Sequence, residues 1–162
     1  MNPRILLIDD HEIVREGIRT LIHRARPDWV ICGEASNAGE ALKAVRGLDP
    51  DIMILDITMP GTSGLELAQR LTTMNVRSRI LIFTMHNSSR LATEVREVGA
   101  QGYVLKSQAA RDLIAAIECL LAGGTFFGAA SETEGPGESK SEPGRGSMIR
   151  RAFGFRAPTF AT

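Results

Sequence analysis

The chain has 162 residues, 43% of them hydrophobic, which is enough for one folded domain and an additional segment. Its 19 lysine and arginine residues balance its 19 aspartate and glutamate residues, so bulk charge predicts neither nucleic-acid nor membrane binding. The only two cysteines, Cys32 and Cys119, exclude a disulfide framework and a close-spaced zinc motif, as is typical of a cytoplasmic protein.

Short apolar runs along the chain predict buried strands. The first run, at residues 5–8, ends at Asp9 and Asp10, so it is too short for a signal peptide or a membrane span. Its length and its bounding residues are those of a strand buried on both faces. Four more strands of this kind are predicted at residues 29–34, 52–55, 80–83 and 103–105.

Between these runs, apolar residues recur every three or four positions, which predicts helices with one buried face. The helix around Leu91, Val95 and Val98 has few apolar residues, so we expect it to be thinly buried. The other four helices have stripes formed by Ile13, Gly17, Ile18, Leu21 and Ile22; by Ala38, Ala41, Leu42 and Val45; by Leu65, Ala68, Leu71 and Met74; and by Leu113, Ile114, Ile117, Leu120 and Leu121.

Five strands alternating with five helices predict an α/β fold with a parallel sheet that is covered by helices on both faces. Short right-handed crossovers favour the strand order 2-1-3-4-5, the flavodoxin-like doubly wound arrangement. We expect this domain to occupy residues 1–124. Residues 131–146 have no large apolar side chain and are rich in Gly, Pro, Ser and Glu, so residues 125–162 are predicted to form a flexible tail that ends in a basic segment.

Polar residues follow the carboxyl ends of the predicted strands, which is where ligands bind in such sheets. In the order 2-1-3-4-5 the first and third strands are neighbours, so the three carboxylates that follow them should converge. The residues at these ends are Asp9 and Asp10 after the first strand, Asp56 after the third, Thr84 after the fourth and Lys106 after the fifth.

Converging carboxylates repel one another unless a cation joins them. Mg²⁺ prefers oxygen ligands and is usually held by one or two carboxylates together with phosphate oxygens. A carboxylate can also act as a nucleophile and form an aspartyl phosphate, while a metal ion and a lysine neutralise charge on the transferred group. The set of residues therefore predicts a phosphoryl acceptor.

The segments that carry these residues resemble the receiver domain of two-component response regulators. They read ILLIDDHEIVREGIRTLI, DIMILDITMPGTSGLELAQRL, ILIFTMH and GAQGYVLKS, and the resemblance extends over residues 4–122. The sequence around DDHEIVREGI and GYVLKS is similar to that of the NarL/FixJ (LuxR-type) subfamily in particular. This resemblance implies a phosphorelay function and a fold that agrees with the one predicted above.

The resemblance also implies roles for individual residues. Asp56 is the residue expected to be phosphorylated. Asp10 and Asp56 are expected to bind Mg²⁺ directly together with the backbone carbonyl of Thr58, and Asp9 is expected to act through a water molecule. Thr84 and Lys106 are expected to contact the phosphoryl group, and Tyr103 is expected to be the aromatic switch residue that turns inward when Thr84 moves.

Each of these residues also has an ordinary interpretation when taken alone. Asp10 could cap a helix, Lys106 could be a surface residue and Tyr103 could simply pack on an edge strand. His11 is expected in the first helical turn rather than at the metal, because Mg²⁺ seldom takes nitrogen ligands. His86 could border the phosphoryl group or lie in a solvated loop. Four fitting residue types at four strand ends favour the phosphoryl-acceptor site.

The expected partner is a histidine kinase or phosphotransfer protein that donates a phosphoryl group to Asp56. We expect a cytoplasmic signalling module and no enzyme, although it would contribute to its own phosphorylation and dephosphorylation. Phosphorylation should switch the face formed by the thin helix at 91–98, the strand at 103–105 and the last helix. That face is the expected surface for dimerisation or partner docking.

The output is less determined by the sequence. NarL/FixJ relatives usually continue into a helix-turn-helix DNA-binding domain, and residues 129–162 are too few for one. The chain could be a stand-alone receiver or a transcription regulator that has lost its DNA-binding part. A flavin or nucleotide module on the same fold is a remote third alternative, since no glycine-rich loop follows the first strand. The arginines and phenylalanines of residues 148–160 could also dock on a partner, on nucleic acid or on an anionic membrane.

Overall fold

A computed structural model describes residues 1–128; the expected tail, apart from residues 125–128, lies outside the described residues. Within them, six parallel strands form one sheet in the order β2-β1-β3-β4-β5-β6. The strands are β1 (Arg4–Ile8), β2 (Val30–Ala35), β3 (Ile52–Leu55), β4 (Arg79–Thr84), β5 (Gly102–Leu105) and β6 (Phe126–Phe127). The predicted order of the first five strands is confirmed.

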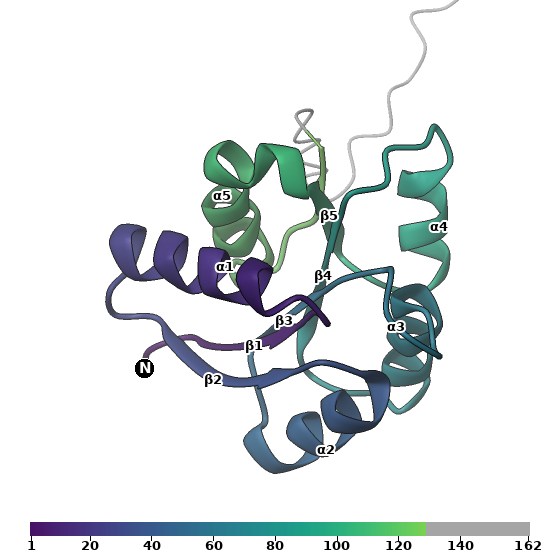
Figure 1. Ribbon diagram of the computed structural model, residues 1–162, viewed down its shortest axis with the longest axis horizontal. Helices are drawn as coiled ribbons and strands as arrows, with labels where there is room; N and C mark the ends of the chain where they lie inside the picture. Colours follow the sequence, from purple (N-terminus) through teal and green to yellow (C-terminus); the bar gives the residue numbers. More distant parts are fainter. Residues whose placement is uncertain (129–162) are drawn as a thin grey trace, which may run out of the picture.

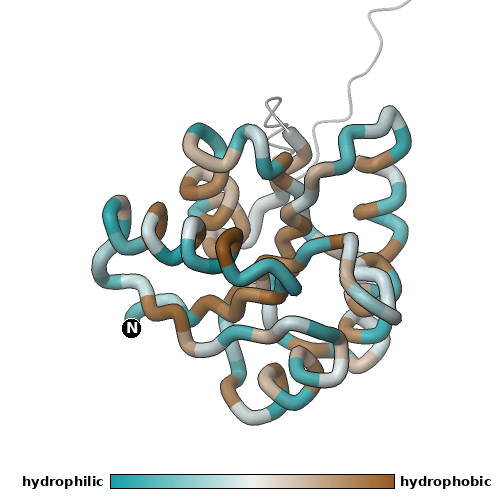
Figure 2. The backbone as a smooth tube through the Cα atoms, in the orientation of Figure 1, coloured by the Kyte–Doolittle hydropathy of each residue, from teal (hydrophilic) through white to brown (hydrophobic). Residues whose placement is uncertain are grey.

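Helices cover both faces of the sheet, as predicted, with α1 and α5 on one face and α2, α3 and α4 on the other (Figure 1). Alternate residues of each strand enter the two layers: Leu6 packs with α2 and α3, and Leu7 packs with α1 and α5. Hydrophobic residues therefore concentrate along the strands (Figure 2). The helices are α1 (Glu12–Ala25), α2 (Ala38–Leu48), α3 (Gly64–Thr73), α4 (Leu91–Glu97) and α5 (Ala109–Leu121), with a 3₁₀ turn, η1 (Lys106–Gln108), before α5.

The buried stripe of α1 differs from the predicted one. Ile18 and Ile22 are buried as expected, but Ile13 is 76% exposed and Gly17 is also exposed. Val14 packs on the core instead. The reason is the helical period, because Val14 lies four residues before Ile18 and hence on the same face. The prediction that Ile13 and Gly17 belong to the core was wrong.

The short helix α4 has two buried residues, Leu91 and Val95, so the prediction of a thinly buried helix is confirmed. A helix with few buried apolar contacts can be displaced at a low cost in free energy. This makes α4 a suitable moving part of the fold. Among residues 1–128, no helix has both the length and the apolar character that a membrane span requires.

Strand β6 was not predicted, and it places folded structure beyond the domain boundary expected at residue 124. Its partner is β5, with Tyr103 opposite Phe127. Gly102 permits this pairing, because a Cβ atom at that position would overlap the carbonyl oxygen of Phe126. The guanidinium of Arg96 lies over the ring of Phe127, 3.9 Å from its centroid, so the strand is also attached to α4.

Candidate functional site

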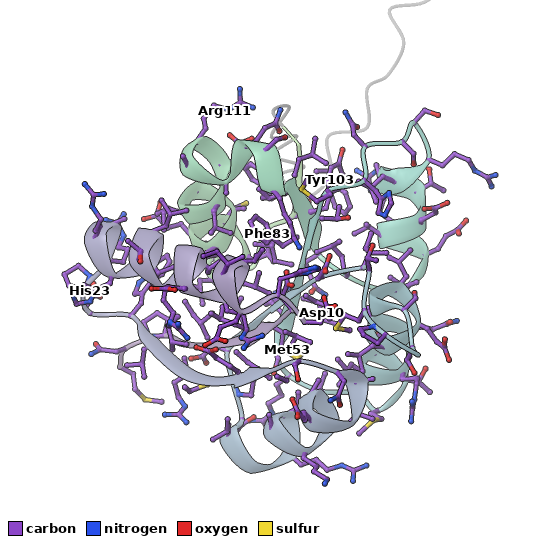
Figure 3. The ribbon with its side chains drawn as sticks, in the orientation of Figure 1. Asp10, His23, Met53, Phe83, Tyr103 and Arg111 are labelled. Atoms are coloured by element: carbon purple, nitrogen blue, oxygen red, sulfur yellow. The ribbon has the colours of Figure 1, made fainter. Side chains whose placement is uncertain are left out.

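The parallel strands bring their carboxyl ends to one edge of the sheet, where the acidic residues meet. Asp9 continues the pairing beyond β1, since its N–H donates to the carbonyl of Ala35 at 3.0 Å. The N–H of Asp56 likewise donates to the carbonyl of Ile8 at 2.9 Å. Asp10 follows at the start of α1 (Figure 3). Backbone hydrogen bonds thus fix the two neighbouring acidic positions.

Gly64 allows α3 to begin close behind Asp56. A Cβ atom at Gly64 would overlap the carbonyl oxygen of Asp56, so only glycine fits there. The N–H of Gly64 donates to the carbonyl of Ile57 at 2.7 Å, which closes the loop after β3. The close approach of Gly64 to the backbone of Asp56 is therefore a packing requirement of this turn.

Three carboxylates and one imidazole form the acidic cluster, defined as Asp9, Asp10, His11 and Asp56, with one ligand atom from each within 4.8 Å of the others. Asp9 is only 2% exposed and Asp56 only 3%. Within residues 1–128, three buried oxygens, Oδ2 of Asp9, Oδ1 of Asp10 and Oδ2 of Asp56, have no partner other than the side chains of Lys106 and His11. Buried carboxylates with so few partners are costly, which indicates an additional cation at this site.

Lys106 supplies the positive side chain that the sequence predicted at this edge. Its Nζ lies 2.7 Å from Oδ2 of Asp9 and 3.3 Å from Oδ2 of Asp56, and the side chain is largely buried. The ammonium is shared between these two carboxylates, so it offsets only part of their charge. A single lysine faces three carboxylates, and a net negative charge remains.

Burial raises the pKa of Asp56 above its ordinary value, and the neighbouring charge of Asp9 raises it further. Lys106 and a backbone contact from Thr58 lower the pKa and partly offset these effects. A carboxylate with a raised pKa is a stronger base and nucleophile than an ordinary surface aspartate. The raised pKa of Asp56 is thus consistent with a nucleophilic role for this carboxylate.

Thr84 and Tyr103 lie at different distances from the acidic cluster. Thr84 is fully buried at the end of β4, and its Oγ1 accepts a hydrogen bond from the N–H of His86 at 3.1 Å. Tyr103 is half-buried and packs edge to face against Phe127, with ring centroids 6.1 Å apart. Thr84 thus lies at the end of the strand next to Asp56, whereas Tyr103 packs at the β5–β6 edge.

Two histidines lie near the carboxyl ends of the strands: His11, a member of the acidic cluster, and His86, in the loop after β4. The Nδ1 atom of His11 lies 3.0 Å from Oδ1 of Asp10 and 3.1 Å from Oδ1 of Asp9, and His11 is the residue directly before α1. The Nε2 atom of His86 makes a hydrogen bond of 3.0 Å with Oγ1 of Thr58. This second contact joins the loops after β3 and β4, and no sequence pattern predicted it.

Sequence reasoning also missed Arg15 and Glu34. Arg15 donates to the backbone carbonyl of Asp9 at 2.6 Å and to Glu34 at 2.8 Å. The available signal was weak: Arg15 lies one helical turn after His11, a position from which a long side chain can reach back to the start of the helix.

The acidic cluster fits a hard divalent cation. Mg²⁺ takes oxygen ligands and keeps several waters, and the cluster offers three carboxylates whose buried oxygens have, within the described part of the chain, only Lys106 and His11 as partners. The imidazole of His11 is a poor ligand for this ion and is already engaged with two carboxylates. The donor set thus matches the Mg²⁺ expected from the sequence.

Comparison with known proteins gives consistent results. The model of the response regulator receiver domain family matches residues 5–118. The nitrate/nitrite response regulator protein NarL of Escherichia coli K12 is 40% identical over 119 residues, which are 74% of this chain and 55% of NarL. The chain thus spans about half the length of the curated relatives it matches.

Two solved structures show the same likeness. A LuxR-family two-component response regulator from Aurantimonas sp. SI85-9A1 has a TM-score of 0.73 at 46% identity, covering 78% of this chain and 89% of the other. The receiver domain of RcsB from Salmonella enterica, solved with the phosphomimetic BeF₃⁻, has a TM-score of 0.72 at 28% identity, covering 78% and 94%. By its fold, its matched residues and its relatives, the chain belongs to the family of response regulator receiver domains.

Proposed function

We propose that Asp56 is the phosphoryl acceptor of this receiver and that the reaction depends on Mg²⁺ held by the acidic cluster. The observation that carries the proposal is the convergence of the carboxylates of Asp9, Asp10 and Asp56, each with a buried oxygen, beside the single ammonium of Lys106. A reactive carboxylate and its counter-charges are thus assembled in one place.

Asp10 and Asp56 would bind the metal directly, with the backbone carbonyl of Thr58, while Asp9 would act through a water molecule. Both oxygens of Asp9 already have partners, Lys106 at Oδ2 and the N–H of His11 at Oδ1, which supports an indirect role. When bound, the metal would screen the negative charge that the incoming phosphoryl group brings to the cluster.

The donor is a phosphohistidine of a histidine kinase or of a phosphotransfer protein. An oxygen of Asp56 forms a bond to phosphorus as the bond from phosphorus to the donor nitrogen breaks. The imidazole keeps the electron pair and takes up a proton from solvent. Lys106 already lies against Asp56 and can balance charge on the transferred group.

Phosphorylation adds about −2 charge and new acceptor oxygens to Asp56. The hydroxyl of Thr84 is then drawn toward the phosphoryl group, together with Lys106. Thr84 lies at the end of β4 directly beside β5, whose register pairs it with Leu105. Its movement opens space into which Tyr103 turns, away from its edge-to-face contact with Phe127.

The surface of α4, β5 and α5 is the output face, and it changes with this movement. The thin burial of α4 supports this role, because Leu91 and Val95 are the only buried residues of this helix. The output face mediates dimerisation or partner binding in the cytoplasm. The domain acts as a signalling module that assists its own phosphorylation and dephosphorylation without turning over another substrate.

Incubation with a small-molecule phosphodonor and Mg²⁺ tests this function. Intact-mass spectrometry should show the addition of one phosphoryl group to the wild-type chain, and EDTA or Asp56→Asn should prevent it. Lys106→Ala should slow the reaction by a factor on the order of 100, as for loss of one electrostatic group in an active site. Equal labelling of the Asp56→Asn protein would refute the proposal.

A further inference from the structure

Arg15 reaches from α1 to the acidic turn without belonging to the acidic cluster. Its side chain is 15% exposed, and the guanidinium has two partners on different elements. Its Nη1 donates to the backbone carbonyl of Asp9 at 2.6 Å, and its Nε donates to Oε2 of Glu34 on β2 at 2.8 Å. The phosphoryl-transfer chemistry proposed above gives neither Arg15 nor Glu34 a role.

The contact completes the fixation of Asp9. The N–H of Asp9 is held by the carbonyl of Ala35, and its Oδ1 accepts a hydrogen bond of 2.8 Å from the N–H of His11. Arg15 takes the remaining backbone group of Asp9, the carbonyl oxygen. Every fixed group in this turn restricts how Asp9 and Asp10 can direct their carboxylates.

Glu34 determines where the guanidinium points. An unpaired arginine beside three carboxylates would be attracted to their free oxygens and would compete with a cation for them. Glu34 provides a carboxylate outside the cluster, shared by Arg15 and Arg19, and so leaves the other edge of Arg15 on a neutral carbonyl. Partial burial opposes ionisation of Glu34, but the hydrogen bonds from the two arginines outweigh it and hold the pKa of Glu34 below its ordinary value.

We propose that Arg15 and Glu34 form a positioning pair that holds the turn at Asp9 and Asp10 in the geometry that binds Mg²⁺. Arg15 fixes the turn, and Glu34 keeps the guanidinium away from the metal ligands. This inference rests on the proposed function, because it concerns the same metal site. Partners that orient ligands from outside the coordination shell typically change metal affinity by about 10- to 100-fold.

Calorimetric titration of the full chain with MgCl₂ alone tests the pair without any phosphodonor. Glu34→Gln should weaken Mg²⁺ binding about tenfold, because Arg15 becomes an uncompensated cation beside the cluster. The double variant Arg15→Gln/Glu34→Gln should bind Mg²⁺ more tightly than Glu34→Gln alone. A purely structural role predicts the opposite order, since the double variant loses more contacts.

Arg19→Gln is the matched control, because it removes a partner of Glu34 but keeps the contact of Arg15 with Asp9. It should leave Mg²⁺ affinity unchanged. If Glu34→Gln does not fold, Arg15→Lys tests the same pair. A lysine keeps the positive charge but cannot contact the carbonyl of Asp9 and the carboxylate of Glu34 through two separate edges, so this variant should also bind Mg²⁺ more weakly.

The outcomes separate the inference from the proposed function. A wild-type chain that binds no Mg²⁺, or an Asp56→Asn chain that binds it equally well, overturns both. Wild-type binding that requires Asp56 but is unaffected by Glu34→Gln or Arg15→Lys, or a double variant weaker than Glu34→Gln, overturns the positioning pair alone.

Discussion

The ionisation of Asp56 works against the folded state when no cation is bound. Burial and the charge of Asp9 raise its pKa, so the native protein holds this proton more tightly than the unfolded chain does. Between the ordinary value of 3.8 and the raised value, the native state carries more protons, and the free energy of unfolding therefore falls as the pH rises. The contribution of the protonated Asp56 to the free energy of unfolding is fully present below pH 3.8 and is lost as the pH rises above the pKa of Asp56 in the native state.

Asp56→Asn should therefore raise the free energy of unfolding at neutral pH in EDTA and remove the fall in stability above the ordinary pKa of the aspartate. Denaturant melts from acid to neutral pH measure both effects, and the exposed Asp28→Asn serves as the control. Addition of Mg²⁺ should stabilise the wild type and not the Asp56→Asn chain. A destabilised Asp56→Asn protein at neutral pH would be inconsistent with an uncompensated buried charge.

The sequence predicted the members of the site better than the contacts between them. Asp9, Asp56 and Lys106 could be located because each follows a strand, and strand order then brings them together. The bond of Thr58 to His86 and the two contacts of Arg15 depend on loop paths and side-chain conformations, which periodicity does not encode. The proposed positions of metal ligands and of the switch residue Tyr103 remain predictions.

At the scale of elements, β6 extends the output face through Phe127, which contacts Tyr103 on β5 and Arg96 on α4. The periodicity that reveals longer strands cannot reveal a strand of two residues. The position of β6 depends on glycine at position 102, because any larger residue would place a Cβ atom against the backbone of Phe126. The five longer strands were predictable because short apolar runs are typical of a parallel sheet; β1, β3 and β4 are largely buried on both faces, whereas β2 at the sheet edge is mostly half-buried.

Gly102→Ala should separate β6 from β5, because the added methyl group would overlap the carbonyl of Phe126. We expect a loss of about 1–3 kcal/mol in the free energy of unfolding, the usual range for overpacking. Gly17→Ala is the control: nothing lies within 4 Å of the added atom, and the helix should gain about 0.5–1 kcal/mol. Denaturant melts compare the two, and equal stabilities would count against a close β5–β6 contact.

At the scale of the whole molecule, one sheet joins the acidic cluster and the proposed output face. The acidic cluster lies at the ends of β1 and β3, and β4 and β5 connect it to α4, which few residues attach to the core. A charge added at Asp56 can thus act on a surface that is already easy to displace.

Association of two chains through the output face should increase with beryllofluoride and Mg²⁺, measured by sedimentation. Reversing an exposed charge of this face, Arg111→Glu, should weaken the dimer by up to roughly fivefold, as for exposed ion pairs worth about 0.2–1 kcal/mol. Arg24→Glu reverses an exposed charge on α1, outside the face, and should have no effect. Equal association of both variants would indicate a different interface.

The most direct test of the central claim is to locate the acyl phosphate in the chain. After reaction with a phosphodonor and Mg²⁺, borohydride reduction converts a phosphorylated aspartate to homoserine, which tandem mass spectrometry assigns to a position. We predict homoserine at position 56 alone, and none when EDTA replaces Mg²⁺. Homoserine at position 9 or 10, or labelling at position 56 that is unaffected by EDTA, would contradict the account.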